Sequence, residues 1–206
     1  MPDQEKFNHC FFNKKTNLNA TIFDVAHAQR VKQVHGNNVI TIDKPQEEWV
    51  EADALVTRTL NLPLGILTED CAPILFYGDG VVGAAHAGWQ GAFNGILDNT
   101  VKAMNIDPNA IQTFIGPSIQ QKSYEVSVGF ETPFLEKHPE AERFFIAGKA
   151  GKLHFDLSGY CAFRLSLCGV KSIHIDGTDT LTHHDYHSHR GGASSSERNL
   201  SAIMLL

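Results

Sequence analysis

The sequence predicts a single domain of the α+β class. Short apolar segments rich in β-branched residues are typical of strands, and several of them follow one another before the first helical pattern. A regular βαβ alternation would instead place a helix after each strand. The chain has 206 residues, 42% of them hydrophobic, which is enough to bury a core. No repeat or linker divides residues 1–206, and residues 1–30 are the least patterned.

The strand-like segments are defined by β-branched and aromatic composition. They are Val39–Ile42, Ala52–Thr57, Leu64–Thr68, Ile74–Tyr77, Val81–His86, Gln112–Ile115, Leu153–Leu157, Ser172–Ile175 and Leu200–Leu205. The residues 78–80, Gly-Asp-Gly, are a strong hairpin signal between the fourth and fifth of these segments.

Three helices are expected. Apolar residues recur at i, i+3 and i+4 over residues 92–104 and predict an amphipathic helix there. A second helix is expected at about Val128 to Lys137. A third follows the segment Leu153–Leu157, with Asp156 or Ser158 as its N-cap and Gly169 at its end.

Charge and composition exclude several classes of protein. The net charge is −6, which argues against non-specific binding to nucleic acid or to anionic membranes. No apolar run approaches the roughly 20 residues of a membrane helix, and the N-terminus lacks a signal-peptide pattern. We therefore expect a cytoplasmic protein. Its four cysteines, Cys10, Cys71, Cys161 and Cys168, are scattered and are expected to be reduced.

Cys71 and His86 flank the expected hairpin at equal distances from its centre. A four-residue loop at 77–80 would place them directly opposite each other, with Cβ atoms about 4.5–5.5 Å apart. Both could then bind one zinc ion at about 2.0–2.3 Å. His35 is the candidate third ligand, which only the tertiary structure could bring close. Three protein ligands with one open position are typical of catalytic zinc.

Seven motifs along the chain resemble those of one known family. They are Gln33-Val34-His35-Gly36, Ala52-Asp53-Ala54-Leu55-Val56-Thr57, Thr68-Glu69-Asp70-Cys71-Ala72-Pro73, His86-Ala87-Gly88-Trp89, Ile115-Gly116-Pro117-Ser118-Ile119, Tyr124-Glu125-Val126 and Ser188-His189-Arg190. In this order they resemble the YfiH family, also called laccase-domain, polyphenol-oxidase-like or purine nucleoside phosphorylase proteins. The resemblance implies a layered α/β/β/α sandwich, and it implies His35, Cys71 and His86 as metal ligands.

The resemblance also implies chemistry on purine nucleosides. The implied reactions are phosphorolysis of adenosine, inosine and methylthioadenosine, and deamination of adenosine, so the partners would be a nucleoside and phosphate. Zinc suits the hydrolytic reaction because it lowers the pKa of bound water. Asp70, beside Cys71, is a candidate acid or base that would act with Cys71 and His86.

The remaining site expectations concern substrate. Gln33, Gly88, Ser118 and Arg190 lie in the motifs and are candidate substrate-binding residues. Residues 88–91 lead into a helix and would offer free N–H groups to phosphate, with Arg190 adding positive charge. Gln90 stands where the family usually has Arg, and Ser118 stands where a Cys is common.

Other interpretations remain open at this point. Copper in place of zinc would make the protein a polyphenol oxidase, although the chain has only one His-x-His pattern, at 187–189, and no His-Cys-His. Cys71 could instead be a nucleophile with His86 as its base, as in a deamidase or a peptidoglycan-editing hydrolase. A non-enzymatic binding module is a further alternative. Asp53 could brace a loop or belong to the site.

Overall fold

The computed structural model describes residues 6–16, 27–194 and 196–206. The strands are β1 (Phe7–Phe11), β2 (Val39–Ile42), β3 (Ala54–Thr57), β4 (Leu64–Thr68), β5 (Ala72–Gly78), β6 (Val81–Ala87), β7 (Gln112–Ile115), β8 (Glu125–Ser127), β9 (Phe145–Ala147), β10 (Lys152–Phe155), β11 (Ser172–Ile175) and β12 (Asn199–Leu205). The α-helices are α1 (Trp89–Asn94), α2 (Ile96–Met104), α3 (Thr132–Lys137) and α4 (Leu157–Leu167), and the 3-10 helices are η3 (Pro108–Ala110) and η4 (Pro139–Phe144).

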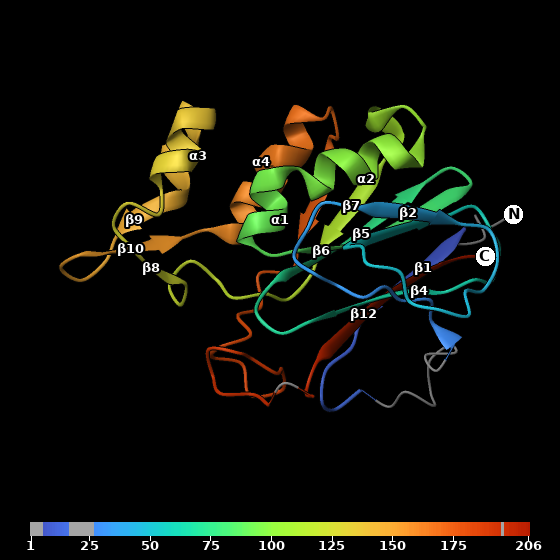
Figure 1. Cartoon of the computed structure of the whole chain (residues 1–206), viewed down its shortest axis with the longest axis horizontal. Coiled ribbons are helices and arrows are strands. Elements are labelled where there is room, and N and C mark those ends of the chain that lie inside the picture. Colours follow the sequence, from blue (N-terminus) through green and yellow to red (C-terminus); the bar gives the residue numbers. More distant parts are fainter. Residues whose placement is uncertain (1–5, 17–26, 195) are drawn as a thin grey trace, which may run out of the picture.

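A six-stranded sheet in the order β11-β7-β5-β6-β3-β2 forms the centre of the molecule. Helices α1, α2 and α4 cover one face of this sheet, and the three-stranded sheet β1-β12-β4 packs against the other face (Figure 1). A second three-stranded sheet, β8-β10-β9, extends to one side together with α3. The α+β class is confirmed, and the described residues form the α, β and β layers of the implied sandwich.

The alternation of side chains in the central strands separates two apolar cores. In β5, Ile74 and Phe76 pack towards the helices, whereas Leu75 packs between the two sheets. Leu55 of β3 and Ala84 of β6 belong to the same inter-sheet core as Leu75. Successive strand residues point to opposite faces. Polar residues that continue this alternation at the strand ends therefore lie on the same inter-sheet face as the apolar core.

Two of the expected helices differ from the observed ones. The single helix expected over residues 92–104 is wrong, because Gly95 adopts φ 94° and separates α1 from α2. The apolar period continues across this break and therefore gives no sign of it. The helix expected from Val128 begins only at Thr132, while Asp156 caps α4 as expected by accepting a hydrogen bond from the Gly159 N–H at 2.8 Å.

The N-terminal segment 1–30 contains a strand that the sequence pattern does not indicate. Residues 7–11 form β1, which pairs antiparallel with β12. Residues 1–5 and 17–26 of this segment lie outside the described residues. Within the described ranges, every helix falls short of the length and apolar character that a membrane span requires.

Candidate metal centre

Strands β5 and β6 form the hairpin that leads to Cys71 and His86. Its turn has only two residues, 79–80, so His86 pairs with Pro73 and the position opposite Cys71 is not His86. The expected four-residue loop is therefore wrong. The register differs from the expected one by two residues, and an even difference leaves every side chain on its original face. Cys71 and His86 thus still face the same side, as diagonal neighbours.

A buried carboxylate holds the His86 ring. Asp53 lies just before β3, beside His86 of β6, and the His86 N–H donates to the Asp53 carbonyl at 2.8 Å. The side chains meet as well, because Nδ1 of His86 lies 2.8 Å from Oδ1 of Asp53. Asp53 is fully buried, and only 4% of His86 is exposed. A carboxylate accepts this hydrogen bond, so Nδ1 carries the proton and Nε2 remains for a metal ion.

The same carboxylate fixes the loop that carries His35. The backbone N–H groups of Val34, His35 and Gly36 all donate to Asp53, at 3.2, 2.9 and 2.7 Å. His35 adopts φ 59°, a conformation that is uncommon for a residue other than glycine. Three consecutive hydrogen bonds hold the backbone in this conformation. Asp53 therefore both braces a loop and belongs to the site, the two roles that the sequence left open.

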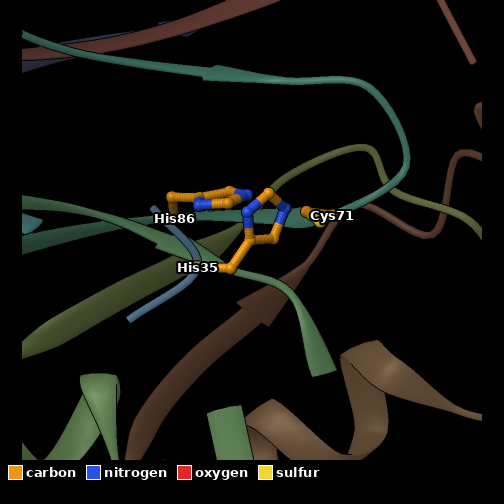
Figure 2. Close-up of side chains that lie close together, drawn as sticks. All are labelled: His35, Cys71 and His86. Carbon is orange, nitrogen blue, oxygen red and sulfur yellow. The ribbon is translucent and has the colours of Figure 1, made fainter. Parts of the chain in front are cut away.

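The three candidate ligands converge from three segments that are distant in sequence (Figure 2). The ligand atoms of His35, Cys71 and His86 all lie within 4.8 Å of one another. The two imidazole rings meet edge to face, with centroids 4.7 Å apart. Ligand atoms around a tetrahedral zinc ion lie about 3–4 Å apart, so small side-chain rotations would bring all three into bonding range. The donor set of two nitrogens and one sulfur fits Zn²⁺, and it also fits copper.

The site is electrostatically coupled. Burial raises the pKa of the Cys71 thiol, but hydrogen bonds with His35 and His86 outweigh this effect and lower the pKa from 9.0 to about 7. Burial lowers the pKa of His86, whereas hydrogen bonds with Asp53 and Cys71 raise it to about 9. Burial also opposes ionisation of Asp53, yet the bonds from His86 and Gly36 keep its pKa below the ordinary value. The centre thus favours a thiolate, which is the metal-binding form of cysteine.

The cluster opens into a cavity of about 730 Å³. Its walls include the three candidate ligands together with polar and aromatic side chains, among them Gln33, Trp49, Asp70, Tyr124 and Arg190. The volume lies in the range of small-molecule sites in proteins, about 300–1,000 Å³. An ion held by the three ligands would therefore have one side open to the cavity.

Asp70 lines the cavity but its oxygens are already engaged. Oδ1 accepts hydrogen bonds from Thr180 at 2.8 Å and from Ser188 at 2.7 Å. Oδ2 accepts from the backbone N–H of Arg190 at 2.8 Å. These contacts tie the 188–190 segment to the residue next to Cys71. They suit a positioning role better than the acid or base role expected from the sequence.

The candidate substrate-binding residues divide into two groups. Gln33 and Arg190 line the cavity, although the Gln33 amide is paired with the backbone of Leu67 at 2.7 and 2.9 Å. Ser118 is fully buried with its hydroxyl 2.9 Å from that of Ser158, so in this conformation it cannot reach a ligand. Gly88 is buried and packs against the candidate ligands.

Gly88 lets these side chains approach the end of β6. A Cβ at this position would lie 3.0 Å from Sγ of Cys71 and 3.2 Å from Cδ2 of His35. Gly88 is also the N-cap of α1, and the described wall of the cavity contains none of residues 88–91. The geometry therefore favours a packing role for Gly88, and it does not support the expected phosphate site at residues 88–91.

Sequence reasoning did not assign a role to several residues of the cavity wall. Tyr124 lies in a recognised motif without an expected role, and Trp49 and Arg198 lie outside the motifs. A local signal existed only for Tyr124, because an aromatic residue inside a motif is itself a candidate. The histidines at positions 183, 184, 187 and 189 form no second cluster, since His35, Cys71 and His86 are the one group of three possible ligands among the described residues.

Comparisons with known proteins identify relatives of this chain. The sequence profile of the family described as multi-copper polyphenol oxidoreductase laccase matches residues 6–206. A purine nucleoside phosphorylase of Rickettsia conorii is 37% identical over 166 residues, which are 79% of this chain and 69% of that protein.

Two solved structures show the same fold. A Neisseria meningitidis protein of the DUF152 family matches with a TM-score of 0.82 and 31% identity, over 86% of this chain and 74% of that one. A Bacillus licheniformis protein called YfiH matches with a TM-score of 0.81 and 24% identity, over 92% of this chain and 78% of that one. The resemblance to YfiH is thereby confirmed, and this chain belongs to the multi-copper polyphenol oxidoreductase laccase family.

Proposed function

We propose that this protein is a zinc-dependent enzyme that cleaves purine nucleosides with phosphate. The observation that carries the proposal is the group of His35, Cys71 and His86, whose ligand atoms lie within 4.8 Å of one another at the wall of a 730 Å³ cavity. The name of the Rickettsia relative, purine nucleoside phosphorylase, supports the reaction class.

The proposed ion would be held by the two imidazoles and the thiolate. Zn²⁺ bound there would act as a Lewis acid and would lower the pKa of a water molecule that it binds. The protein's own contribution is orientation, because Asp53 fixes the His86 ring and the backbone that carries His35. The ligands therefore need little rearrangement on binding.

The proposed reaction is balanced without a further reactant. An oxygen of hydrogen phosphate forms a bond to C1′ of the sugar, and the bond from C1′ to the purine nitrogen breaks. The electron pair stays on the purine, which takes the proton of the hydrogen phosphate, so the products are the free purine and a sugar 1-phosphate. The aromatic side chain of Trp49 offers a flat surface for a purine ring in the cavity.

Deamination of adenosine is the second reaction that we propose for the same site. Here the oxygen of a water molecule forms a bond to C6 of the adenine ring, and the bond from C6 to the exocyclic nitrogen breaks. That nitrogen takes one proton of the water and leaves as ammonia, so the products are inosine and ammonia. Adenosine, inosine and methylthioadenosine are the proposed substrates. We also propose a cytoplasmic location with no nucleic-acid or membrane partner, supported by the acidic composition and by four cysteines without disulfides, which are typical of a reducing compartment.

One experiment tests both reactions. Zinc-loaded protein is incubated with adenosine, inosine or methylthioadenosine, with and without phosphate, and products are separated by chromatography. Phosphate-dependent release of the free base is expected, and inosine formation from adenosine without phosphate would report deamination. Cys71→Ser should abolish turnover and metal binding, whereas Cys168→Ser, at a residue that does not line the cavity, should retain both. Full turnover by folded Cys71→Ser would contradict the proposal.

A cysteine hydrolase is the second candidate function, including deamidation or peptidoglycan editing. It is favoured by the low pKa of Cys71, about 7, next to an imidazole. The two candidates respond oppositely to a chelator. Metal removal should abolish the proposed nucleoside reactions, but it should leave or increase the activity of a cysteine nucleophile, which alkylation would then remove.

Copper oxidase chemistry receives less support from the geometry. A multi-copper oxidase needs several metal clusters, and the described residues contain one group of three possible ligands. Metal analysis of protein purified without added metal distinguishes zinc from copper, and an assay of phenol oxidation with that protein checks the activity directly. A metal-loaded protein without turnover in either assay would instead be a binding module.

A further inference from the structure

We propose that the guanidinium of Arg190 and the hydroxyl of Tyr124, which adjoin each other in the cavity wall beside Cys71, form the binding subsite for inorganic phosphate. The inference rests on the proposed function, since it names where that reaction's second substrate binds. Both residues follow Cys71 in the sequence, whereas the 34–36 loop precedes it. The proposed subsite replaces the helix N-terminus at residues 88–91 as the phosphate site.

The two side chains form one unit. The guanidinium carbon of Arg190 lies 5.3 Å from the centre of the Tyr124 ring, within the range of a cation–π contact. Both side chains line the same cavity as Cys71 and His86. The charges of Cys71, Arg190 and Asp70 act on the Tyr124 hydroxyl, so the hydroxyl lies near both the metal centre and the guanidinium.

Arg190 is held in place from both ends. Its backbone N–H donates to Oδ2 of Asp70 at 2.8 Å, and its guanidinium donates to the carbonyl of Glu125 at 3.0 Å. Asp70 precedes Cys71 and Glu125 follows Tyr124, so the metal centre and the proposed subsite are joined through short stretches of chain. A group held in this way binds with little loss of conformational entropy.

The charges of the cavity wall leave Arg190 available for an anion. Of the other basic side chains there, Lys32 pairs with Glu51 at 2.8 Å and Arg198 pairs with Glu69 at 2.6 Å. His189 also lies near Glu69, with 3.5 Å between Nδ1 and Oε2. Within the described part of the chain, no carboxylate pairs with the guanidinium of Arg190.

The carboxylates of the wall are likewise engaged. Asp70 accepts hydrogen bonds from Thr180, Ser188 and the Arg190 backbone, and Glu69 pairs with Arg198. The Tyr124 hydroxyl has no hydrogen-bond partner among the described residues. A guanidinium and a hydroxyl with unused donors, side by side, match the oxygens of a tetrahedral anion.

The position also suits the reaction. A phosphate held by Arg190 and Tyr124 would lie beside Cys71, within the cavity that the nucleoside is proposed to occupy. The attacking oxygen would thus be confined close to the sugar, and confinement of two reactants in one orientation is a large part of the rate enhancement in such reactions.

The test compares Arg190→Ala, Arg190→Lys and Tyr124→Phe with the wild type, all zinc-loaded. Loss of a charge-assisted hydrogen bond is expected to raise the KM for phosphate about 10- to 100-fold in Arg190→Ala. Arg190→Lys, which keeps charge but not the planar fork, should show a smaller rise, and so should Tyr124→Phe. The KM for the nucleoside should change less than twofold. An unchanged KM for phosphate in Arg190→Ala and Tyr124→Phe would overturn the inference.

Arg143→Ala is the matched control. Arg143 also lies over aromatic rings, 4.8 Å from the Phe144 centre and 4.9 Å from the Phe163 centre, but it is exposed on η4 and does not line the cavity. Its removal should leave the KM for phosphate unchanged. An equal rise in this variant would show a general effect of surface charge and would overturn the inference.

Calorimetric titration of the zinc-loaded protein with inorganic phosphate alone separates the inference from the proposed function. Phosphate binding that weakens in Arg190→Ala supports the subsite even if no nucleoside is cleaved, in which case the proposed function fails alone. Phosphate-dependent cleavage with equal phosphate affinity in wild type and Arg190→Ala supports the function and overturns the subsite. No phosphate binding by the wild type in either assay overturns both.

Discussion

Oδ1 of Asp53 lies 2.8 Å from Nδ1 of His86, and both side chains are buried. The same carboxylate accepts three backbone N–H groups from the loop that carries His35. One buried anion therefore determines the position of two of the three candidate ligands. Such partners of a ligating histidine set its tautomer and orientation, and their loss typically costs 10- to 100-fold in metal affinity.

Asp53→Asn should weaken zinc binding by about 10- to 100-fold. In asparagine an NH₂ group, which is a donor, replaces one of the two accepting oxygens. It would face an N–H group that now donates to Asp53, so either the 34–36 loop or the His86 ring must move. A competition titration with a coloured zinc chelator measures the affinity. Asp43→Asn, at an exposed position, is the control and should bind zinc like the wild type. Wild-type affinity in Asp53→Asn would show that the pair does not orient the ligands.

In metal-free protein, Cys71 should be alkylated fastest of the four cysteines at neutral pH. Its pKa of about 7 lies below the ordinary value, so about half is thiolate at pH 7, whereas burial raises the pKa of Cys161 and, to about 11, that of Cys168. Because the thiolate fraction falls as the proton concentration rises, the rate should level off above about pH 8 and fall about tenfold per unit below about pH 6.

Iodoacetamide labelling followed by peptide mass spectrometry measures these rates residue by residue. Added zinc should protect Cys71 and leave the slow labelling of Cys168 unchanged. Equal labelling of Cys71 with and without zinc would argue against a metal–thiolate bond.

Gly88→Ala should reduce zinc affinity by about tenfold without unfolding the protein. Its new Cβ would lie 3.0 Å from Sγ of Cys71 and 3.2 Å from Cδ2 of His35, so both candidate ligands must shift. Gly83→Ala in β6, the strand that ends just before Gly88, is a matched control, because its nearest atoms lie at an ordinary 3.4–3.5 Å. Zinc titration and thermal unfolding of both variants check the prediction, and equal affinities would count against it.

Asp98→Asn should destabilise the fold by about 3 kcal/mol while the metal site remains intact. Asp98 accepts two hydrogen bonds from the buried Arg164, at 2.8 and 2.7 Å, and Arg164 also donates to the carbonyls of Ala92 and Phe93 at 3.0 Å. Loss of one partner leaves a buried charge without its counter-ion.

Urea unfolding at pH 7 measures this loss, and the exposed Glu136→Gln is the control. A change of less than about 0.5 kcal/mol in Asp98→Asn, which is typical of surface substitutions, would contradict the prediction.

The strands of the central sheet were predictable because their signal is local. The expected bounds of β2, β7 and β11 in this sheet agree with the observed ones, as do those of β4 in the sheet packed against it. The register of the hairpin was not predictable in the same way, because the loop length depends on Gly80, which adopts φ 72° and permits a two-residue turn. The break between α1 and α2 at Gly95 was also not predicted, because the spacing of apolar residues is unchanged by an altered φ at one residue.

The residue types of the candidate centre, and the shared face of Cys71 and His86, follow from the chain alone, because side chains alternate with a period of two and an even error in register preserves the face. The approach of His35, the burial of Asp53 and the contact between Arg190 and Tyr124 were decided by the tertiary structure. These contacts join segments separated by many residues, and only the packing of the sheets and the path of the loops brings such segments together.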